Sequence, residues 1–449
     1  MKKTKHTRIT TTRIIMGGFL LGIIIGTLLL CLPESTVNGI PAIDAFFVAV
    51  SSICVTGLST VNIGATFTTL GQIILLVLIE VGGLGVITFS VLVMILFGQR
   101  ISLTNRMLIQ NAYNTDSMSG LIRMTKRIIK LSCLIQGLGA LAYCFIFVPE
   151  YGPVGIWYSI FHSVSAYCNA GIDLLGGNSL VQYRDHLAIN LITMTLIVAG
   201  GLGFPVYWEI WRLITHSDEK KHQYRKKMSI RAKMALVATA VLILGGALVT
   251  LVFEWNNPLT IGELPFGKKV LASFFQSVTL RTAGFATIDQ SGFTPASCMI
   301  YIVLMLIGGS PSGTAGGIKT VTMMILIASM ITNIRGGSQV NLFHRQVTDA
   351  YVRTCSAIAT FSVGTLIVLT SLLMFVQGGD FLDSFYEMSS AVATVGLSRG
   401  LTGDLNQWGK LIVCLTMYLG RIGPITMALA FNYKKPADVS YADDKITIG

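Results

Sequence analysis

Four short segments of the chain end in a glycine and share one register, a pattern that could surround a dehydrated cation. The glycines are 114, 113 and 112 residues apart, each is followed by an apolar residue, and each has an aromatic ring ten residues upstream, at Phe47, Phe161, Phe274 and Tyr386. Four aligned copies indicate a repeated unit, whereas one copy would mean little. The segments are DAFFVAVSSICVTGLST (44–60), YSIFHSVSAYCNAGIDL (158–174), VLASFFQSVTLRTAGFA (270–286) and DSFYEMSSAVATVGLSR (383–399).

The chemistry that such loops offer is the replacement of water around a cation. Rings of backbone carbonyls can replace the hydration shell of a potassium ion when four loops meet around one axis. Glycine allows the dihedral angles that turn successive carbonyls inward, and it leaves the axis unobstructed. The register therefore predicts an ion-selectivity filter with three residues from each copy: Val55, Thr56 and Gly57; Asn169, Ala170 and Gly171; Thr282, Ala283 and Gly284; Thr394, Val395 and Gly396.

The elements that would position these loops are apolar helices. The chain is 52% hydrophobic and 12% charged, with a mean hydropathy of +0.68, and each apolar run is long enough to cross a hydrocarbon core of about 30 Å. Eight spans are predicted, near 13–32, 71–97, 129–148, 187–211, 232–253, 298–334, 354–377 and 408–431. Glycines recur in the second span of each copy, within EVGGLGV (80–86), VAGGLGF (198–204), LIGGSPS (306–312) and YLGRIGP (418–424).

The predicted fold is therefore an all-α polytopic membrane protein with eight transmembrane helices and four re-entrant pore helices around a pseudo-fourfold pore. Each copy consists of a span, a short re-entrant helix, a loop ending in glycine and a second span. Non-helical backbone at membrane depth is tolerated only where it lines a cavity or is buried in protein. The predicted ranges are a tail at 1–12, copies at 13–98, 129–214, 232–334 and 354–432, and a second tail at 433–449.

The net charge of +12 is explained by topology, and nucleic-acid binding is a poor explanation for it. Basic residues concentrate in the N-terminal tail and in the loops 98–130 and 212–233, whereas the opposite loops carry the acids. The positive-inside rule places the basic segments, and both termini, in the cytoplasm. The sequence predicts a multi-pass protein of the cytoplasmic membrane, surrounded by lipid.

Other ionisable residues give no catalytic pattern. GxSxG, HExxH and paired intramembrane aspartates do not occur, and the eight cysteines have no metal-like spacing, so neither an enzyme nor a cofactor is expected. The membrane acids Glu80 and Glu209 stand alone in the sequence, although Glu80 could partner a basic residue. His162 is expected to be a packed residue. Arg281 is expected to brace the third loop through carbonyls or Asp289, the alternative being that it snorkels to the outer surface.

The four copies, together with GGSPSGTAGGIKT (308–320) and GRIGP (420–424), resemble the superfamily of Ktr, Trk and plant HKT cation transporters. The chain is most similar to the Ktr-type membrane subunit, because no extra spans precede the first copy. The resemblance implies a potassium-translocating homodimer with one pore per protomer, and it leaves open whether sodium activates transport. It also implies a cytosolic ring of nucleotide-binding regulatory subunits. This chain has no GxGxxG after a strand and no P-loop, so another polypeptide must supply that control.

The resemblance also implies a gate. Five glycines and a proline interrupt an apolar span, and in the family this stretch is a flexible loop that blocks the pore beneath the filter. The implied gate residues are Gly308, Gly309, Ser310, Pro311, Ser312, Gly313, Thr314, Ala315, Gly316, Gly317 and Lys319, where Lys319 either anchors the loop or faces the inner cavity. The order Ser312-Gly313 departs from the Gly-Ser order common in the family.

Arg421 is expected in the middle of the last span, where the family places an arginine that faces the pore below the filter. At about 6 Å and a dielectric of about 20, it would repel a potassium ion by about 2.8 kcal/mol. Sodium-preferring plant members have a serine at the first filter glycine, so Gly57 favours potassium.

Two alternatives to potassium uptake remain from the sequence. One is a sodium-selective conductor of the same fold. The other is a secondary transporter of organic solutes, but such proteins often carry inverted repeats, whereas these two-span units share one orientation. The sequence leaves open whether transport is channel-like or a symport.

Overall fold

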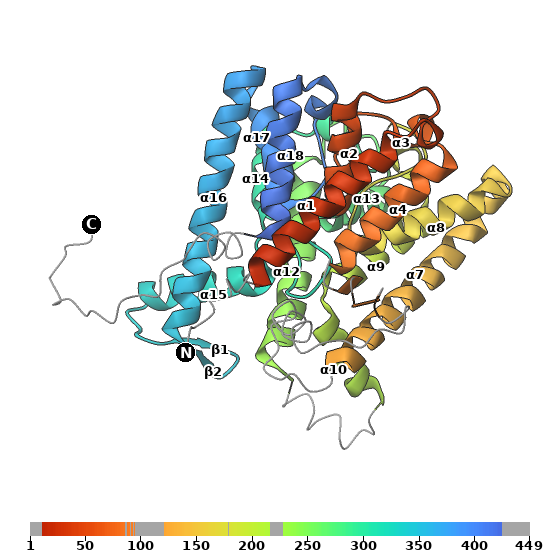
Figure 1. Cartoon of the computed structure of the whole chain (residues 1–449). Coiled ribbons are helices and arrows are strands. Elements are labelled where there is room, and N and C mark those ends of the chain that lie inside the picture. Colours follow the sequence, from red (N-terminus) through yellow and green to blue (C-terminus); the bar gives the residue numbers. More distant parts are fainter. Residues whose placement is uncertain are drawn as a thin grey trace, which may run out of the picture.

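In the computed structural model the described part of the chain is mostly helical, which confirms the predicted helical class (Figure 1). The structure describes residues 11–85, 121–177, 179–215 and 228–423, together with 88, 89, 91, 92 and 94. The predicted C-terminal tail, most of the N-terminal tail and much of the basic loops 98–130 and 212–233 lie outside the described residues. The topology inferred from those charges therefore stays a prediction.

Within the described residues, four long apolar helices have the length and composition to cross a membrane: α1 (Thr11–Leu30), α7 (Leu121–Tyr151), α12 (Ile230–Phe253) and α16 (Asp349–Gln377). Their outward faces are apolar, since Phe145 on α7 is 83% exposed and Phe375 on α16 is 88% exposed. Apolar surface of this extent is typical of helices that face lipid.

A second set of helices is shorter, because each ends at the glycines of its copy. These helices are α4 (Thr69–Leu84), α9 (Leu187–Gly201), α14 (Pro295–Leu306) and α18 (Gln407–Ile422). Gly85, Gly203 and Gly423 take φ values of 83° to 85°, a left-handed conformation that ends an α-helix at little cost only for glycine. The predicted spans near 71–97, 187–211 and 408–431 are therefore each interrupted by a break in the helix. After Gly203 the chain turns by 101° into α10 (Phe204–Thr215).

The predicted re-entrant segments form four short helices: α2 (Ala42–Cys54), α8 (Val154–Cys168), α13 (Phe266–Thr279) and α17 (Phe381–Ala393). Proline precedes the first three, at Pro41, Pro153 and Pro265, and the Asp380 side chain accepts hydrogen bonds from the first turn of α17. The four helices are largely buried between the longer ones (Figure 1).

The third copy contains the predicted break in the span 298–334. The glycine-rich loop (residues 308–320) separates α14 from α15 (Thr320–Ile334). A small hairpin that was not predicted follows, in which β1 (Val340–Leu342) pairs antiparallel with β2 (Arg345–Val347). Its two turn residues, Phe343 and His344, both have positive φ, as a tight hairpin turn requires. Short helical turns complete the described fold: η1 (Pro33–Ser35), α3 (Ile63–Thr66), η2 (Val181–Tyr183), η3 (Gln290–Gly292) and η4 (Leu401–Asp404).

Candidate ion-binding site

Each short helix carries two equivalent residues that precede the glycine of its copy and fix the helix and its loop. The first is an aromatic ring with no exposed surface, at Phe47, Phe161, Phe275 and Tyr386. The second is a hydroxyl four residues later, at Ser51, Ser165, Thr279 and Ser390. In the third copy the buried ring is Phe275, one residue after the Phe274 that lies ten residues before Gly284. The third copy has one residue fewer between its hydroxyl and its glycine than the other copies have, and a register fixed on the glycines misplaces every residue before that deletion.

The hydroxyls tie each loop back to its own helix. Ser51 Oγ accepts a hydrogen bond from the Gly57 amide at 3.0 Å, and Ser390 Oγ accepts one from the Gly396 amide at 3.0 Å. In the other two copies the hydroxyl donates instead to the carbonyl that follows the glycine, from Ser165 Oγ to Ile172 at 2.6 Å and from Thr279 Oγ1 to Phe285 at 2.5 Å. Each loop is thus held across the end of its helix.

The first predicted filter residue of every copy has a left-handed backbone. The φ values are 56° at Val55, 59° at Asn169, 61° at Thr282 and 52° at Thr394. Three of the four residues are β-branched, for which this region of φ/ψ space is strained. Such strain persists only where surrounding contacts hold it, and it is often found at functional sites.

The structure brings the four predicted loops together in a closed ring. A methyl group placed on Gly57 would lie 2.5 Å from the Ala170 carbonyl oxygen, so the first loop faces the second at van der Waals distance. The other three glycines face the next loop in the same way. A methyl group on Gly171 would meet the Ala283 carbonyl oxygen, one on Gly284 that of Val395, and one on Gly396 that of Thr56. The glycine φ values run from 65° to 102°. Any side chain at these positions would collide with the neighbouring backbone.

A cavity of about 660 Å³ lies on one side of the ring, and all four glycines line it. Its charged lining includes Asp173, Asp289 and Arg399. Burial raises the pKa of the Asp173 carboxyl to about 7, although hydrogen bonds from the Leu175 and Gly176 amides oppose the shift. The carboxylate nearest in sequence to the ring can therefore change charge near neutral pH.

The glycine-rich loop packs against the ends of α8 and α17, which are the helices of the second and fourth copies. The Thr314 hydroxyl donates to the Tyr167 carbonyl at 3.2 Å, and a methyl group on Gly316 would collide with Thr394 Oγ1. The amides of Ser310 and Thr314 donate to the carbonyls at the end of α9, at 2.9 and 3.1 Å. Lys319 Nζ donates to the Ala315 carbonyl at 2.7 Å, so this side chain closes the loop on itself.

Arg421 is attached to the glycine-rich loop. One guanidinium nitrogen donates to the Thr314 carbonyl at 2.6 Å, and the other donates to the Gly82 carbonyl on α4. Arg421 lies in the last turn of α18, which ends at Ile422; its depth in the membrane stays a prediction. A side chain there links the first copy, the third-copy loop and the fourth copy.

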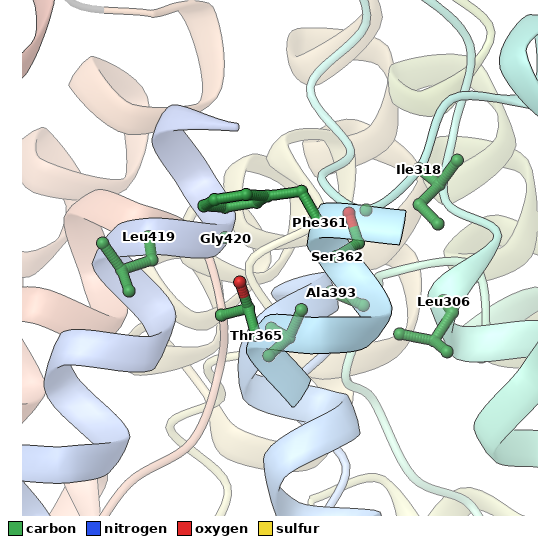
Figure 2. Close-up of a pocket in the computed structure, with 10 residues that line it drawn as sticks. Leu306, Ile318, Phe361, Ser362, Thr365, Ala393, Leu419 and Gly420 are labelled. Carbon is green, nitrogen blue, oxygen red and sulfur yellow. The ribbon is translucent and has the colours of Figure 1, made fainter. Parts of the chain in front are cut away.

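A small cavity of about 30 Å³ lies beside the same loop (Figure 2). Phe361, Ser362 and Thr365 of α16 line it together with Leu306, Ile318 and Leu419. The lining is mostly apolar, whereas the face of the loop toward the ring is hydrogen-bonded.

The snorkelling alternative for Arg281 is wrong, whereas its bracing of the third loop stays a prediction. Its side chain is only 7% exposed, which excludes snorkelling to the surface. Among the described residues its Nε has no hydrogen-bond partner, and the Asp289 carboxylate accepts instead from the Ser291 amide at 3.0 Å.

Neither membrane glutamate stands alone. Glu80 accepts from the Gln136 amide at 3.0 and 3.3 Å and from the Cys168 thiol at 3.2 Å. Glu209 accepts from the Ser229 amide at 2.9 Å. The partners of Glu80 are neutral, and they lie 56 and 88 residues away in the sequence, a separation that no local pattern reveals. As predicted, His162 is packed, with rings of Tyr143, Phe147, Phe161 and Phe285 around it.

Both the sequence and the fold match known proteins. The TrkH family, described as "Cation transport protein", matches residues 4–442. The Ktr system potassium uptake protein B of Bacillus subtilis (strain 168) is 35% identical over all of this chain and 99% of its own length. The potassium/sodium uptake protein NtpJ of Enterococcus hirae is 36% identical over all of this chain and 99% of its own length. The crystal structure of the potassium transporter TrkH from Vibrio parahaemolyticus superposes with a TM-score of 0.72 at 17% identity, covering 96% of this chain and 87% of that one, which supports the same fold.

Proposed function

This chain belongs to the TrkH family of cation transport proteins, and on that premise we propose that it moves potassium ions into the cell through the ring of four glycine-ended loops. The resemblance predicted from the sequence is confirmed, and so is the expectation of a transport protein rather than an enzyme. The family and the long apolar helices make it a multi-pass membrane protein. Its orientation, with both termini in the cytoplasm, is part of the proposal.

The observation that carries the proposal is the closed order of the ring. Each glycine faces the carbonyl that precedes the glycine of the next copy, from the first copy through the fourth and back to the first. Carbonyls arranged in this way can replace the water around a potassium ion. The four copies, each with a short helix and a tied loop, support a pseudo-fourfold pore whose filter consists of the twelve predicted residues.

We assign the gate to the glycine-rich loop with Lys319 and Arg421. The loop packs directly against Thr394 and Tyr167 at one end of the filter, where it would obstruct an ion leaving the ring. The bond from Arg421 to the Thr314 carbonyl brings a fixed positive charge to the same place. A cation that passed there would meet both a steric and an electrostatic barrier.

The assembly is also part of the proposal. The names of the Bacillus subtilis and Vibrio alginolyticus relatives refer to a Ktr system, which implies more than one component. We propose a homodimer that sits on a separate nucleotide-binding regulatory ring. The potassium/sodium name of NtpJ is a reason to test sodium in two roles, as an activator and as a second transported ion.

The test is rubidium uptake, a proxy for potassium, in a potassium-uptake-deficient bacterium that expresses this chain with its regulatory partner. The native chain should restore growth at low potassium, and sodium should compete weakly. Gly57→Ser should reduce rubidium uptake about tenfold or admit sodium, because a side chain there meets the Ala170 carbonyl and distorts the ring. Native protein that reaches the membrane yet moves neither ion would overturn the filter and favour the organic-solute transporter.

A further inference from the structure

We infer that Arg399 and Asp383 form a latch that holds the fourth glycine-ended loop and thereby sets the selectivity of the ring for potassium over sodium. The inference rests on the proposed filter. Arg399 follows Gly396 by three residues, and Asp383 lies in the first turn of α17, the helix of the same copy. Arg399 Nε donates to Asp383 Oδ1 at 2.7 Å, with the arginine side chain 13% exposed. The pair therefore joins the two ends of the helix-loop unit.

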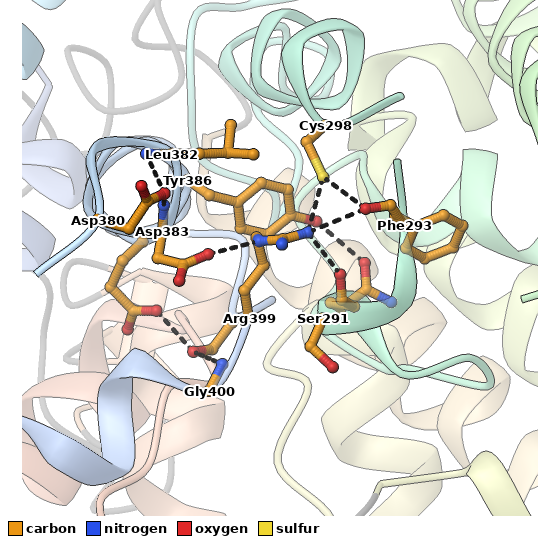
Figure 3. A network of polar contacts seen from close by, with 12 residues as sticks. Ser291, Phe293, Cys298, Asp380, Leu382, Asp383, Tyr386, Arg399 and Gly400 are labelled. Carbon is orange, nitrogen blue, oxygen red and sulfur yellow. Dashed lines mark hydrogen bonds and ion pairs between the residues drawn. The ribbon is translucent and has the colours of Figure 1, made fainter. Parts of the chain in front are cut away.

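The same guanidinium reaches the outer loop of the third copy (Figure 3). Its NH1 nitrogen donates to the carbonyls of Gln290 and Phe293 at 3.1 and 3.3 Å and contacts Cys298 Sγ at 3.0 Å. A guanidinium presents several donors in one plane, so it can serve the carboxylate and the carbonyls at once. A lysine could keep the charge but not this geometry.

Gln290 carries the connection inward to both helices. The Tyr386 hydroxyl on α17 donates to Gln290 Oε1 at 2.9 Å, and the Gln276 amide on α13 donates to the same oxygen at 2.8 Å. Within the fourth loop, Ser398 Oγ donates to Glu387 on α17 at 2.6 Å. Arg399 is thus the cationic member of a network that fixes the third and fourth copies relative to each other.

The copies differ in the residues that stand at the positions of Asp383 and Arg399. The first copy has the equivalent acid, Asp44, again thirteen residues before its glycine, and Thr60 donates to it at 2.6 Å. Lys410 on α18, in the fourth copy, also pairs with Asp44 at 2.6 Å. The second copy has Tyr158 and Leu174 at the two positions, so it has neither the acid nor the donor. Polar ties therefore run through the third, fourth and first copies.

A ring selects potassium only if its oxygens keep a fixed spacing, or a fixed number and orientation, against the pull of a smaller ion. Loss of one partner leaves the other charge partly buried and unpaired, and the fourth loop is then free to move. We expect Arg399→Gln and Asp383→Asn each to lower the preference for rubidium over sodium by about tenfold, the effect of losing one charge-assisted hydrogen bond. The double variant should lower it no further.

The measurement is sodium inhibition of rubidium uptake in cells that express the full chain with its partner, normalised to the amount in the membrane. Lys268→Gln is the matched control, because it breaks an exposed pair between the first turn of α13 and Asp185, also at 2.7 Å. It should leave selectivity unchanged. Arg399→Lys, which keeps the charge next to Asp383, should lie between the native chain and Arg399→Gln, and it carries the test if Arg399→Gln does not reach the membrane.

Gly57→Ser in the same experiment separates the latch from the filter. Native selectivity in Arg399→Gln and Asp383→Asn, with altered transport in Gly57→Ser, would overturn the latch and leave the filter standing. Native transport in all three variants would overturn the proposed filter itself.

Discussion

Glu80 illustrates how an acidic side chain can be accommodated in the apolar interior without a cationic partner. Gln136 and Cys168 both donate hydrogen bonds to its carboxyl oxygens. Cys168 ends α8, directly before Asn169 of the second loop. Glu80 therefore holds the start of the second loop through its contact with the last residue of α8.

We expect Glu80→Gln to reduce rubidium uptake about tenfold, because its new amide nitrogen would face the Gln136 amide and leave a buried donor unpaired. Cys168→Ser retains a donor and should keep most of the uptake. Membrane levels of both variants need to be equal for the comparison. Equal transport in Glu80→Gln and the native chain would contradict a positioning role.

Asp173 gives a pH dependence whose sign follows from its raised pKa. Below about pH 7 the carboxyl in the 660 Å³ cavity is protonated and neutral, and above it the group is negative and attracts cations. Asp289 and Arg399 line the same cavity. Rubidium uptake at limiting concentration should therefore rise as external pH passes from 6 to 8, about twofold to threefold. Asp173→Asn should remove the rise, and a rise that persists in this variant would assign it to another group.

At the scale of elements, the glycine-rich loop is the part whose displacement should matter most. Gly316 touches Thr394, and a methyl group at Gly316 cannot fit unless the loop moves away from the ring. We expect Gly316→Ala to raise rubidium uptake about threefold in cells that lack the regulatory partner, because the obstruction is relieved. Gly364→Ala on α16 is the control, since a methyl group there meets no atom within 4 Å. Lower uptake in Gly316→Ala than in the control would mean that the loop supports the open pore.

The sequence predicted the short helices and their loops because glycine spacing repeats where backbone geometry repeats. It failed where the copies differ. A register fixed on Gly284 could not reveal the residue missing from the end of α13, so Phe274 was chosen in place of Phe275. The ends of α4, α9 and α18 were missed because glycines inside an apolar run also suit close helix packing, and only the positive φ distinguishes the two. The spacing of Asp44 and Asp383 to their glycines was visible in the sequence and could have pointed to the latch.

At the scale of the whole molecule, the comparisons and the apolar faces of the long helices agree on a membrane-embedded cation transporter. The polar contacts among the copies are uneven around the ring. Asp44, Lys410 and Arg399 join the first, third and fourth copies. The second copy is joined to the first through Glu80 and through Trp157 and Gln72, and to the third through Asp185 and Ser179. Substitutions in different copies should therefore perturb the ring in different ways.

The missing residue in the third copy has one more consequence. In a pore assembled from four identical chains, every deletion or substitution would occur four times, and a shortened helix end would shrink all sides of the ring together. Because one polypeptide supplies all four sides here, a single quadrant can be shortened while the other three keep their length. The permeation path can then lie off the geometric centre of the ring. Each copy can also differ from the others in its rigidity, its charge or its contact with the glycine-rich loop.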